Sequence, residues 1–208
     1  MTDITTWEAI GLAEKHLRKE ADVGPLIHAI GSLGKDVVGL ELGVFRGDSF
    51  MTMLHACPNI KTLYGIDSYQ PYEDCIGEPY TGTPFYTVDK KESDFNRLVT
   101  FHRIEHSGMK EKVVFHEIDS NEALKKFEPF SLDFIFIDTF ITYEQAVKDF
   151  RSWYPIVKNG GLFAGHDWTG AIIQRAIDEV KSEVEPHARV IGYGNCWSWI
   201  KQETITLY

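Results

Sequence analysis

Cysteine is scarce in this chain of 208 residues. Cys57, Cys75 and Cys196 stand far apart, and no two of them form a CxxC pair. Their spacing argues against a disulfide framework or a zinc knot and is typical of a reduced, cytosolic protein. Basic side chains are also in deficit, because 21 Lys and Arg face 31 Asp and Glu, for a formal net charge of −10. Phosphate backbones repel a chain this acidic, so we expect no nucleic-acid partner.

Long apolar runs are missing as well. None approaches the roughly 18 residues that a membrane helix needs, and the first ten residues lack the basic start and apolar core of a signal peptide. We therefore expect a cytoplasmic protein without a membrane partner. The chain has no internal repeat and no Pro/Ser linker, and its length is that of one domain. Residues 1–208 are predicted to form that domain.

Helical patterns and short apolar segments alternate along most of the sequence. Helices are predicted over 5–19, 24–32, 48–56, 93–106, 121–127, 143–157 and 171–184, and strands over 37–42, 62–66, 113–118, 132–137, 162–164, 190–193 and 196–201. This order predicts an α/β layered fold with a mostly parallel sheet. Such sheets bind ligands beyond the carboxyl ends of their strands. The first candidates for a site are therefore the polar residues near those ends: Glu41, Asp67, Asp119, Asp138 and the pair His166-Asp167.

A glycine-containing loop, ELGVFRG, joins the strand 37–42 to the helix 48–56. Gly43 and Gly47 let the backbone come close to a ligand, and the helix start offers free N–H groups to an anion. Asp67 follows Gly47 by 20 residues, and it could accept hydrogen bonds from both ribose hydroxyls of a nucleotide-like ligand. The alternative is a tight turn and a surface aspartate. Val44 and Phe45 break the GxGxxG spacing of a dinucleotide site, which argues against a nicotinamide-dependent oxidoreductase.

The loop resembles the first motif, E/D-x-G-x-x-x-G, of the class I S-adenosylmethionine-dependent methyltransferases. From residue 136 onwards, FIDTFITYEQ and the later GGLFAGHDW are similar to the pattern FIDGxHxYE…GGxxxGHDW of a small-molecule branch of that family. The resemblance covers about residues 37–168. It implies a Rossmann-like three-layer sandwich whose seven-stranded sheet is mostly parallel with an antiparallel last strand. It also implies methylation of a hydroxyl group on a small-molecule acceptor, such as a sugar or a secondary metabolite.

On this resemblance the cofactor is S-adenosyl-L-methionine. The residues expected to bind it are Glu41, Gly43, Val44, Gly47, Asp67, Ser68, Asp119, Ser120 and Asp138. Glu41 and Gly43 would border the methionine portion, Asp67 the ribose, and Asp119-Ser120 the adenine. Asp119 could instead cap the helix 121–127, or do both.

The resemblance also places Asp138 and Asp167 where related enzymes hold a divalent cation. Oxygen ligands on adjacent strand ends suit Mg²⁺, and a bound cation would hold the acceptor oxygen. The family's usual base is missing, because Thr139, Phe140 and Ile141 replace its Gly, polar residue and His. His166 then becomes the candidate base, because the unperturbed pKa of histidine lies near neutrality.

Asp138 joins His166 as a candidate catalytic residue. Other roles stay open for both: a structural hydrogen bond for His166, and a bond to the cofactor or a turn for Asp138. The absence of the usual base also keeps open a non-catalytic module that only binds the cofactor.

Two further segments have a distinct character. Residues 1–34 are predicted to form an N-terminal helical segment. Residues 69–88 are rich in Tyr, Pro and Gly and exceed a normal connection in length, so we predict a lid over the acceptor, with Tyr69 among its walls. A segment ordered only by packing on itself or against a neighbouring subunit is the alternative, which leaves a homodimer open.

Overall fold

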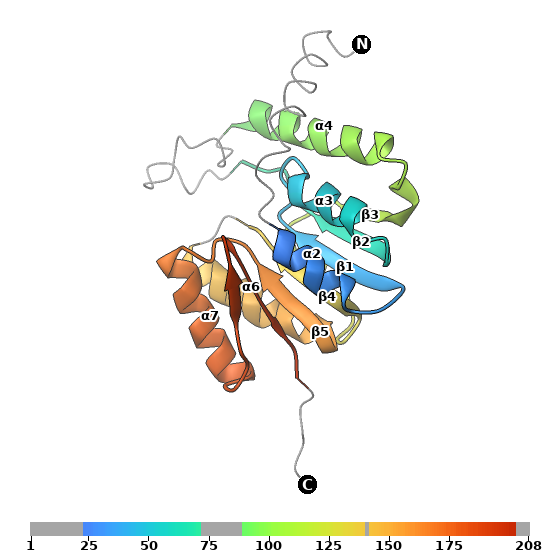
Figure 1. Ribbon diagram of the computed structural model, residues 1–208. Coiled ribbons are helices and arrows are strands. Elements are labelled where there is room, and N and C mark those ends of the chain that lie inside the picture. Colours follow the sequence, from blue (N-terminus) through green and yellow to red (C-terminus); the bar gives the residue numbers. More distant parts are fainter. Residues whose placement is uncertain (1–22, 72–88, 140–141, 203–208) are drawn as a thin grey trace.

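The computed structural model describes residues 23–71, 89–139 and 142–202 (Figure 1). Its seven-stranded sheet has the order β3-β2-β1-β4-β5-β7-β6. The strands are β1 (Val37–Leu42), β2 (Ile60–Ile66), β3 (Val113–His116), β4 (Leu132–Ile137), β5 (Val157–Gly165), β6 (Ile191–Tyr193) and β7 (Cys196–Ile200). The helices are α2 (Gly24–Gly31), α3 (Asp48–Ala56), α4 (Lys90–His106), α5 (Ser120–Leu124), α6 (Tyr143–Trp153) and α7 (Ala171–Val184), with short 3₁₀ turns η3 (Lys110–Lys112) and η4 (Tyr154–Ile156).

The strand order creates a switch point in the middle of the sheet. From β1 the chain moves outward through β2 and β3, then returns to β4 on the other side of β1 and continues to β5. These five strands are parallel, and β7 is antiparallel to both β5 and β6. The predicted mostly parallel sheet with an antiparallel last strand is thus confirmed. A crevice at the carboxyl ends of β1 and β4 is where such folds bind ligands.

Helices cover both faces of the sheet, as Figure 1 shows. In β4, Phe134 and Phe136 pack into the core beneath α2 and α3, whereas Ile135 and Ile137 pack into the core beneath α6 and α7. Successive strand residues point to opposite faces, so a strand covered on both sides reads as an unbroken apolar run. This explains the sequence LDFIFI and confirms the predicted three layers.

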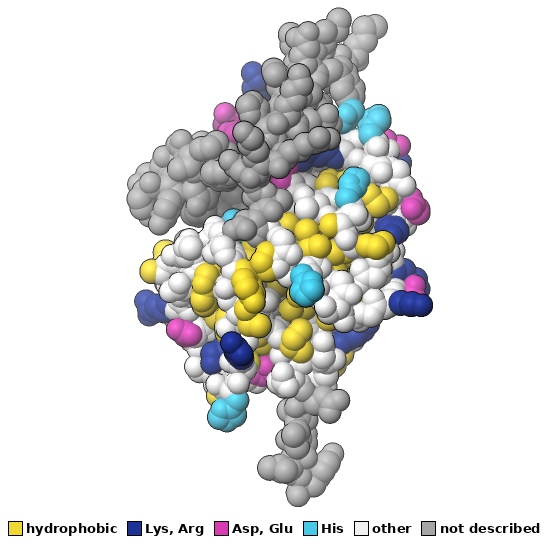
Figure 2. Space-filling view, in the orientation of Figure 1, with side chains coloured by type: hydrophobic (Ala, Val, Ile, Leu, Met, Phe, Trp, Pro, Cys, Tyr) yellow, Lys and Arg dark blue, Asp and Glu magenta, His cyan; other side chains and the backbone are white. Residues whose placement is uncertain are grey.

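The exposed large hydrophobic side chains are spread over several elements: Leu98, Val114, Phe130, Ile172, Ile191, Tyr193 and Ile200. Figure 2 shows hydrophobic side chains lying between polar and charged ones on the face turned to the viewer. No helix in the described ranges combines the length and the apolar character needed to cross a membrane.

The structure corrects the boundary between the predicted helix 143–157 and strand 162–164. The helix α6 ends at Trp153, because Pro155 lacks the N–H that a longer helix would need, and η4 follows it. The strand β5 begins at Val157 and runs through Gly160 and Gly161, which the sequence reading treats as a stop signal. A side chain at Gly161 would lie 2.7 Å from the Asp133 carbonyl oxygen. The glycine therefore serves strand packing.

Other boundaries move by a few residues. The helix α4 begins at Lys90 instead of residue 93, because the Asp89 side chain caps it by accepting from the Glu92 N–H (2.8 Å). The strand β2 begins two residues earlier than predicted, β3 ends two residues earlier, and α5 ends three residues earlier. The predicted helix 5–19 and most of the predicted lid, residues 72–88, lie outside the described residues.

Candidate active site

Gly43 brings the ends of β1 and β4 together at the switch point. Its backbone is left-handed (φ +84°), and its N–H donates to the Ile66 carbonyl (2.9 Å). Beside it, the Asp138 N–H donates to the Leu42 carbonyl (2.8 Å). A Cβ on Gly43 would lie 2.2 Å from the Asp138 carbonyl oxygen, which is closer than any side chain tolerates. Only glycine therefore fits this junction.

Asp67 holds the glycine loop in shape. Its Oδ2 accepts from the N–H groups of Val44 (3.0 Å) and Phe45 (2.8 Å), and its Oδ1 accepts from the N–H of Tyr69 (2.8 Å). Burial raises the pKa of Asp67 overall, while these backbone hydrogen bonds work to lower it. A carboxylate has about four acceptor positions. A ribose hydroxyl would therefore share this carboxylate with the backbone of the loop. The support that Asp67 gives to the loop is a structural role that the sequence does not predict.

Glu41 is fully buried on β1. Its Oε1 accepts a hydrogen bond from the Ser49 hydroxyl, and its Oε2 has no hydrogen-bond partner among the described residues. Burial, with smaller contributions from Asp138, Asp48 and Asp67, raises the pKa of Glu41 well above its usual range, although the Ser49 bond lowers it. A buried acceptor without a partner is costly. A cationic group of a cofactor would satisfy it, so this residue fits the predicted cofactor.

Three further predicted cofactor residues lie at the same edge of the sheet. Gly47 is the N-cap of α3 with a left-handed backbone (φ +81°), and Val44 is buried behind the loop. Ser68 follows β2, and its hydroxyl oxygen accepts from the Gln70 N–H (3.3 Å). The glycine loop and the end of β2 therefore meet as the sequence predicts, at the carboxyl edge of the sheet.

Asp119 is the N-cap of α5, which confirms the capping alternative. Its Oδ1 accepts from the backbone N–H and the side-chain Nδ2 of Asn121, both at 2.8 Å. Partial burial works to raise the pKa of Asp119, but the hydrogen bonds outweigh it and the pKa is lowered. The neighbouring Ser120 hydroxyl donates to Asp149 Oδ1 (3.3 Å) on α6. Binding of adenine by this pair stays a prediction.

Asp138, His166 and Asp167 form one cluster at the ends of β4 and β5. His166 Nδ1 lies 3.5 Å from Asp138 Oδ1 and 3.1 Å from Asp167 Oδ1. Burial raises the pKa of Asp138 to about 6, His166 works to lower it, and Asp167 raises it further. The hydrogen bond with His166 holds the pKa of Asp167 below its usual range. The cluster therefore contains one firmly ionised carboxylate and one that titrates near neutrality.

Asn195 and Trp197 support this cluster, and sequence reasoning missed both. Asn195 Nδ2 donates to Asp167 Oδ1 (3.2 Å), and the Trp197 indole N–H donates to the His166 carbonyl (2.8 Å). Asp167 itself has a left-handed backbone (φ +60°). The Gly194-Asn195 turn is visible in the sequence, and turn asparagines often bond to nearby groups. Nothing in the sequence, however, connects that turn to Asp167.

Ligand atoms of Asp138, His166 and Asp167 all lie within 4.8 Å of one another, so this set could hold a metal ion. A hydrogen bond from Nδ1–H to Asp167 would leave Nε2 as the basic nitrogen of a neutral imidazole. The same three residues thus fit either a cation site or a general base. Phe140 and Ile141, which replace the family's usual base, lie outside the described residues.

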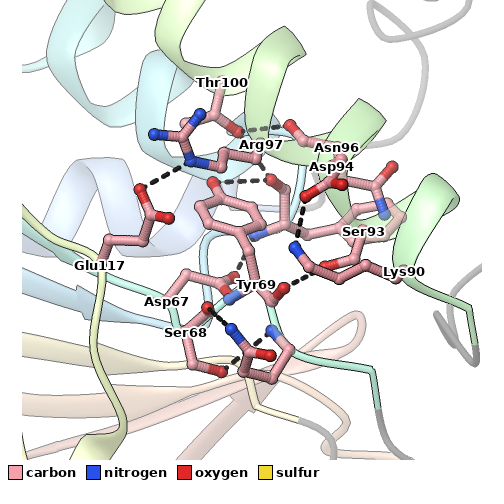
Figure 3. A network of polar contacts seen from close by, with 12 residues as sticks. Asp67, Ser68, Tyr69, Lys90, Ser93, Asp94, Asn96, Arg97, Thr100 and Glu117 are labelled. Atoms are coloured by element: carbon pink, nitrogen blue, oxygen red, sulfur yellow. Dashed lines mark hydrogen bonds and ion pairs between the residues drawn. The ribbon is translucent and has the colours of Figure 1, made fainter.

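The structure corrects the role predicted for Tyr69. It is 4 % exposed and stacks on Phe115, with ring centroids 6.0 Å apart. Its hydroxyl donates to the Phe45 carbonyl (3.0 Å), and Figure 3 shows the ring close to Asn96 and Thr100 of α4. The apolar ring and the hydroxyl both make contacts within the protein. Tyr69 therefore supports the glycine loop instead of forming a wall of the lid.

Comparisons with known proteins identify the family. Residues 40–168 match the family model described as a methyltransferase domain, which is more than half of the chain. The chain therefore belongs to this family and is a class I methyltransferase that depends on S-adenosylmethionine. A search of curated protein sequences found no match.

Solved structures with the same fold agree with the family match. The structure of the O-methyltransferase NovP is 18% identical with a TM-score of 0.62, over 88% of this chain and 80% of that one. The structure of cofactor-bound Rv0187 from MTB is 14% identical with a TM-score of 0.62, over 97% of this chain and 92% of that one. At these identities the likeness shows the Rossmann-like fold.

Proposed function

We propose that this enzyme transfers the methyl group of S-adenosylmethionine to a hydroxyl oxygen of a small-molecule acceptor, with His166 as the general base. The observation that carries the proposal is the position of His166 Nδ1, which lies 3.1 Å from Asp167 and 3.5 Å from Asp138 at the carboxyl ends of β4 and β5. The description of NovP as an O-methyltransferase supports oxygen as the atom that is methylated.

The reaction asks the protein mainly for alignment and for removal of one proton. The sulfonium of the cofactor is already activated, so the acceptor oxygen attacks the methyl carbon and the bond from sulfur to that carbon breaks. His166 takes the hydroxyl proton while Asp167 holds the imidazole. Asp138, ionised above a pKa of about 6, stabilises the imidazolium that forms.

The cofactor would lie along the carboxyl ends of β2, β1 and β4. We propose that it is bound by the residues named for this role from the sequence: Glu41, Gly43, Val44, Gly47, Asp67, Ser68, Asp119, Ser120 and Asp138. Two features support this placement: Glu41 Oε2 has no hydrogen-bond partner within the described part of the chain, and the backbone junction at Gly43 leaves no room for a side chain. The surrounding carboxylates favour a ligand that carries positive charge.

A divalent cation is the second candidate feature of this site. For Mg²⁺, Asp138 and Asp167 would supply carboxylate oxygens without His166, although the ligand atoms of all three residues lie within 4.8 Å of one another. Mg²⁺ prefers oxygen ligands, whereas imidazole suits zinc or another transition metal better. A bound cation would stabilise the charge of the acceptor oxygen. In this mechanism His166 is not required as a base, so the two candidates differ in the expected effect of His166→Ala.

The test measures S-adenosylhomocysteine formed with a panel of sugars, phenols and other hydroxylated small molecules. We expect His166→Ala to lower turnover by roughly 100-fold or more, and His187→Ala, a change at an exposed histidine, to leave it unchanged. Activity that survives EDTA and collapses in His166→Ala supports the general base. Activity lost to EDTA, restored by Mg²⁺ and tolerant of His166→Ala would overturn it in favour of the cation.

A further inference from the structure

The backbone of the glycine loop adopts a conformation that depends on contacts with neighbouring residues. Phe45 has φ +52°, a left-handed conformation that a bulky residue rarely adopts, between Gly43 at +84° and Gly47 at +81°. Such conformations persist only where surrounding contacts impose them. The loop is also the part of the chain that, under the proposed function, presents its backbone to the cofactor. Its shape must therefore be supplied by neighbours.

One face of α4 supplies several of these contacts. Thr100 Oγ1 donates to the Phe45 carbonyl (2.6 Å), and Asn96 Oδ1 accepts from Arg46 Nε (2.7 Å). Arg103 donates to the Arg46 carbonyl (2.8 Å). Positions 96, 100 and 103 recur at the spacing of one helical face.

Arg103 adds a charge contact to this backbone bond. The same guanidinium nitrogen lies 2.5 Å from Asp48 Oδ1, in the first turn of α3. The Arg103 side chain is 11 % exposed, so the interaction is screened less than a surface ion pair. An acid in that turn would otherwise repel an anionic group of a ligand at the helix start. Arg103 therefore fixes both the backbone of the loop and the charge beside it.

We infer that Thr100 and Arg103 are positioning residues for the cofactor, acting through the carbonyls of Phe45 and Arg46. Thr100 is fully buried beneath the loop, and Figure 3 shows it on α4 beside Asn96 and above Tyr69. With the Tyr69 hydroxyl also bonded to the Phe45 carbonyl, the loop is held from α4 and from the end of β2 together. This inference rests on the cofactor site of the proposed function.

The experiment measures the Kd for S-adenosylhomocysteine by calorimetry in the full chain. Thr100→Val removes the hydroxyl and keeps the shape, and Arg103→Met removes the charge and keeps the stem. We expect each to raise Kd by about 5- to 30-fold, the scale of one or two lost hydrogen bonds. Arg103→Lys should recover part of the affinity, because an ammonium can still donate to the carbonyl.

Arg97→Met is the matched control on the same helix. Arg97 pairs with Glu117 (2.7 Å) and lies over the ring of Phe101 on the same helix, and its side chain is 40 % exposed. We expect its Kd to equal that of the wild type. In turnover assays, Thr100→Val and Arg103→Met should raise KM for the cofactor and keep kcat at saturation. A loss of stability alone would lower the number of binding sites and leave Kd unchanged.

Asp67→Asn separates this inference from the proposed site. If Asp67→Asn weakens binding while Thr100→Val and Arg103→Met bind as the wild type does, the positioning role is overturned and the cofactor site stands. If the wild type binds S-adenosylhomocysteine and Asp67→Asn binds it equally well, the proposed cofactor site is wrong and the inference fails with it. Weaker binding in all three variants, with Arg97→Met unaffected, supports both.

Discussion

Gly43 makes two separable demands on the side chain at its position. Its left-handed backbone disfavours any other residue, and a Cβ would also lie 2.2 Å from the Asp138 carbonyl oxygen. We expect Gly43→Ala to lower the free energy of unfolding by roughly 3 kcal/mol or more, because strain and overlap add. Urea unfolding, followed by circular dichroism, measures this loss.

Gly160→Ala is the control that measures the cost of the left-handed backbone alone. It has φ +77°, and a Cβ there would meet nothing within 4 Å. Gly160→Ala should therefore cost only about 1 kcal/mol, the usual penalty of a left-handed residue. Equal losses in the two variants would contradict the steric role of Gly43.

The Asp138 carboxyl makes stability depend on pH. Its pKa is raised to about 6, mainly by burial, so between the unfolded and folded pKa values the native state binds more protons. Stability is then largest below the unfolded pKa and falls as the pH rises through about 6. At about pH 7.5 the free energy of unfolding of Asp138→Asn should exceed that of the wild type by roughly 1–2 kcal/mol, once partial exposure is allowed for. Urea unfolding measures this difference.

The same comparison near pH 4 checks the cause. There the wild-type carboxyl is protonated in the native state, so the advantage of Asp138→Asn should largely disappear. An advantage that stays constant from about pH 4 to pH 7.5 would show that the substitution acts through packing instead of charge.

At the scale of residues, the sequence predicts which groups meet but not what holds them. Asp138, His166 and Asp167 were expected together, because parallel strands end at one edge of a sheet. The bonds from Asp67 to the loop and from Asn195 to Asp167 depend on loop conformations. No periodicity encodes such conformations, so these contacts appear only in three dimensions.

At the scale of elements, Asp119 connects helix stability to the predicted adenine site. Asp119→Ala removes the acceptor for the Asn121 N–H and should cost about 1 kcal/mol of unfolding free energy, whereas Asp119→Asn should cost a few tenths. We expect Asp119→Asn also to keep its affinity for S-adenosylhomocysteine, because the amide oxygen can replace the one oxygen, Oδ1, that bonds to Asn121. Asp67 differs in that both of its carboxylate oxygens accept hydrogen bonds. Thermal unfolding and calorimetry on the two variants measure both quantities.

Thr142→Ala is the matched control for the cap. Thr142 caps α6 by accepting from the Gln145 N–H (3.2 Å), and it is not among the predicted cofactor residues. Thr142→Ala should lose about as much unfolding free energy as Asp119→Ala and keep its full affinity for S-adenosylhomocysteine. We expect Asp119→Ala, in contrast, to weaken the binding of S-adenosylhomocysteine. If Asp119→Ala and Thr142→Ala both lost affinity, affinity would follow helix stability, and the adenine role of Asp119 would lose its support.

The elements themselves follow from the sequence with errors that have local causes. Strands buried on both faces, such as β4, were predicted with their observed bounds, because their apolar runs are continuous. The start of β5 was missed because Gly160 and Gly161 break the apolar run, although the second glycine lies in the strand to let the Asp133 carbonyl approach. Composition indicates a turn there, and only packing distinguishes it from a strand.

At the scale of the whole molecule, the alternation of strands and helices was enough to predict the class of fold and the edge of the sheet where the candidate site lies. A seven-stranded sheet with an antiparallel last strand was implied by the family resemblance, and the structure confirms it. The extent of the domain over 1–208, the lid and a homodimer stay predictions. They depend on contacts between segments that lie far apart in sequence, and such contacts have no local signature.

The charge of the molecule predicts how salt acts on its two ligands. The chain carries a formal net charge of −10, and Asp138, Asp48 and Asp67 all act on the buried Glu41. S-adenosylmethionine has a net positive charge at neutral pH because of its sulfonium, whereas S-adenosylhomocysteine has none. A negative site attracts only the first through its net charge, and dissolved salt screens that attraction.

Raising sodium chloride from about 0.02 to about 0.5 M should raise the Kd for S-adenosylmethionine by roughly 3- to 10-fold, because the screening length then falls from above 20 Å to about 4 Å. The Kd for S-adenosylhomocysteine should change by less than about 2-fold, since the net charge of this ligand is zero. Sinefungin, which carries an amine in place of the sulfonium, is the control and should follow S-adenosylmethionine. Calorimetry at the two salt concentrations gives all three values. If the three ligands weaken equally, the carboxylates around Glu41 do not select for the charge of the methyl donor, and salt acts on the protein itself.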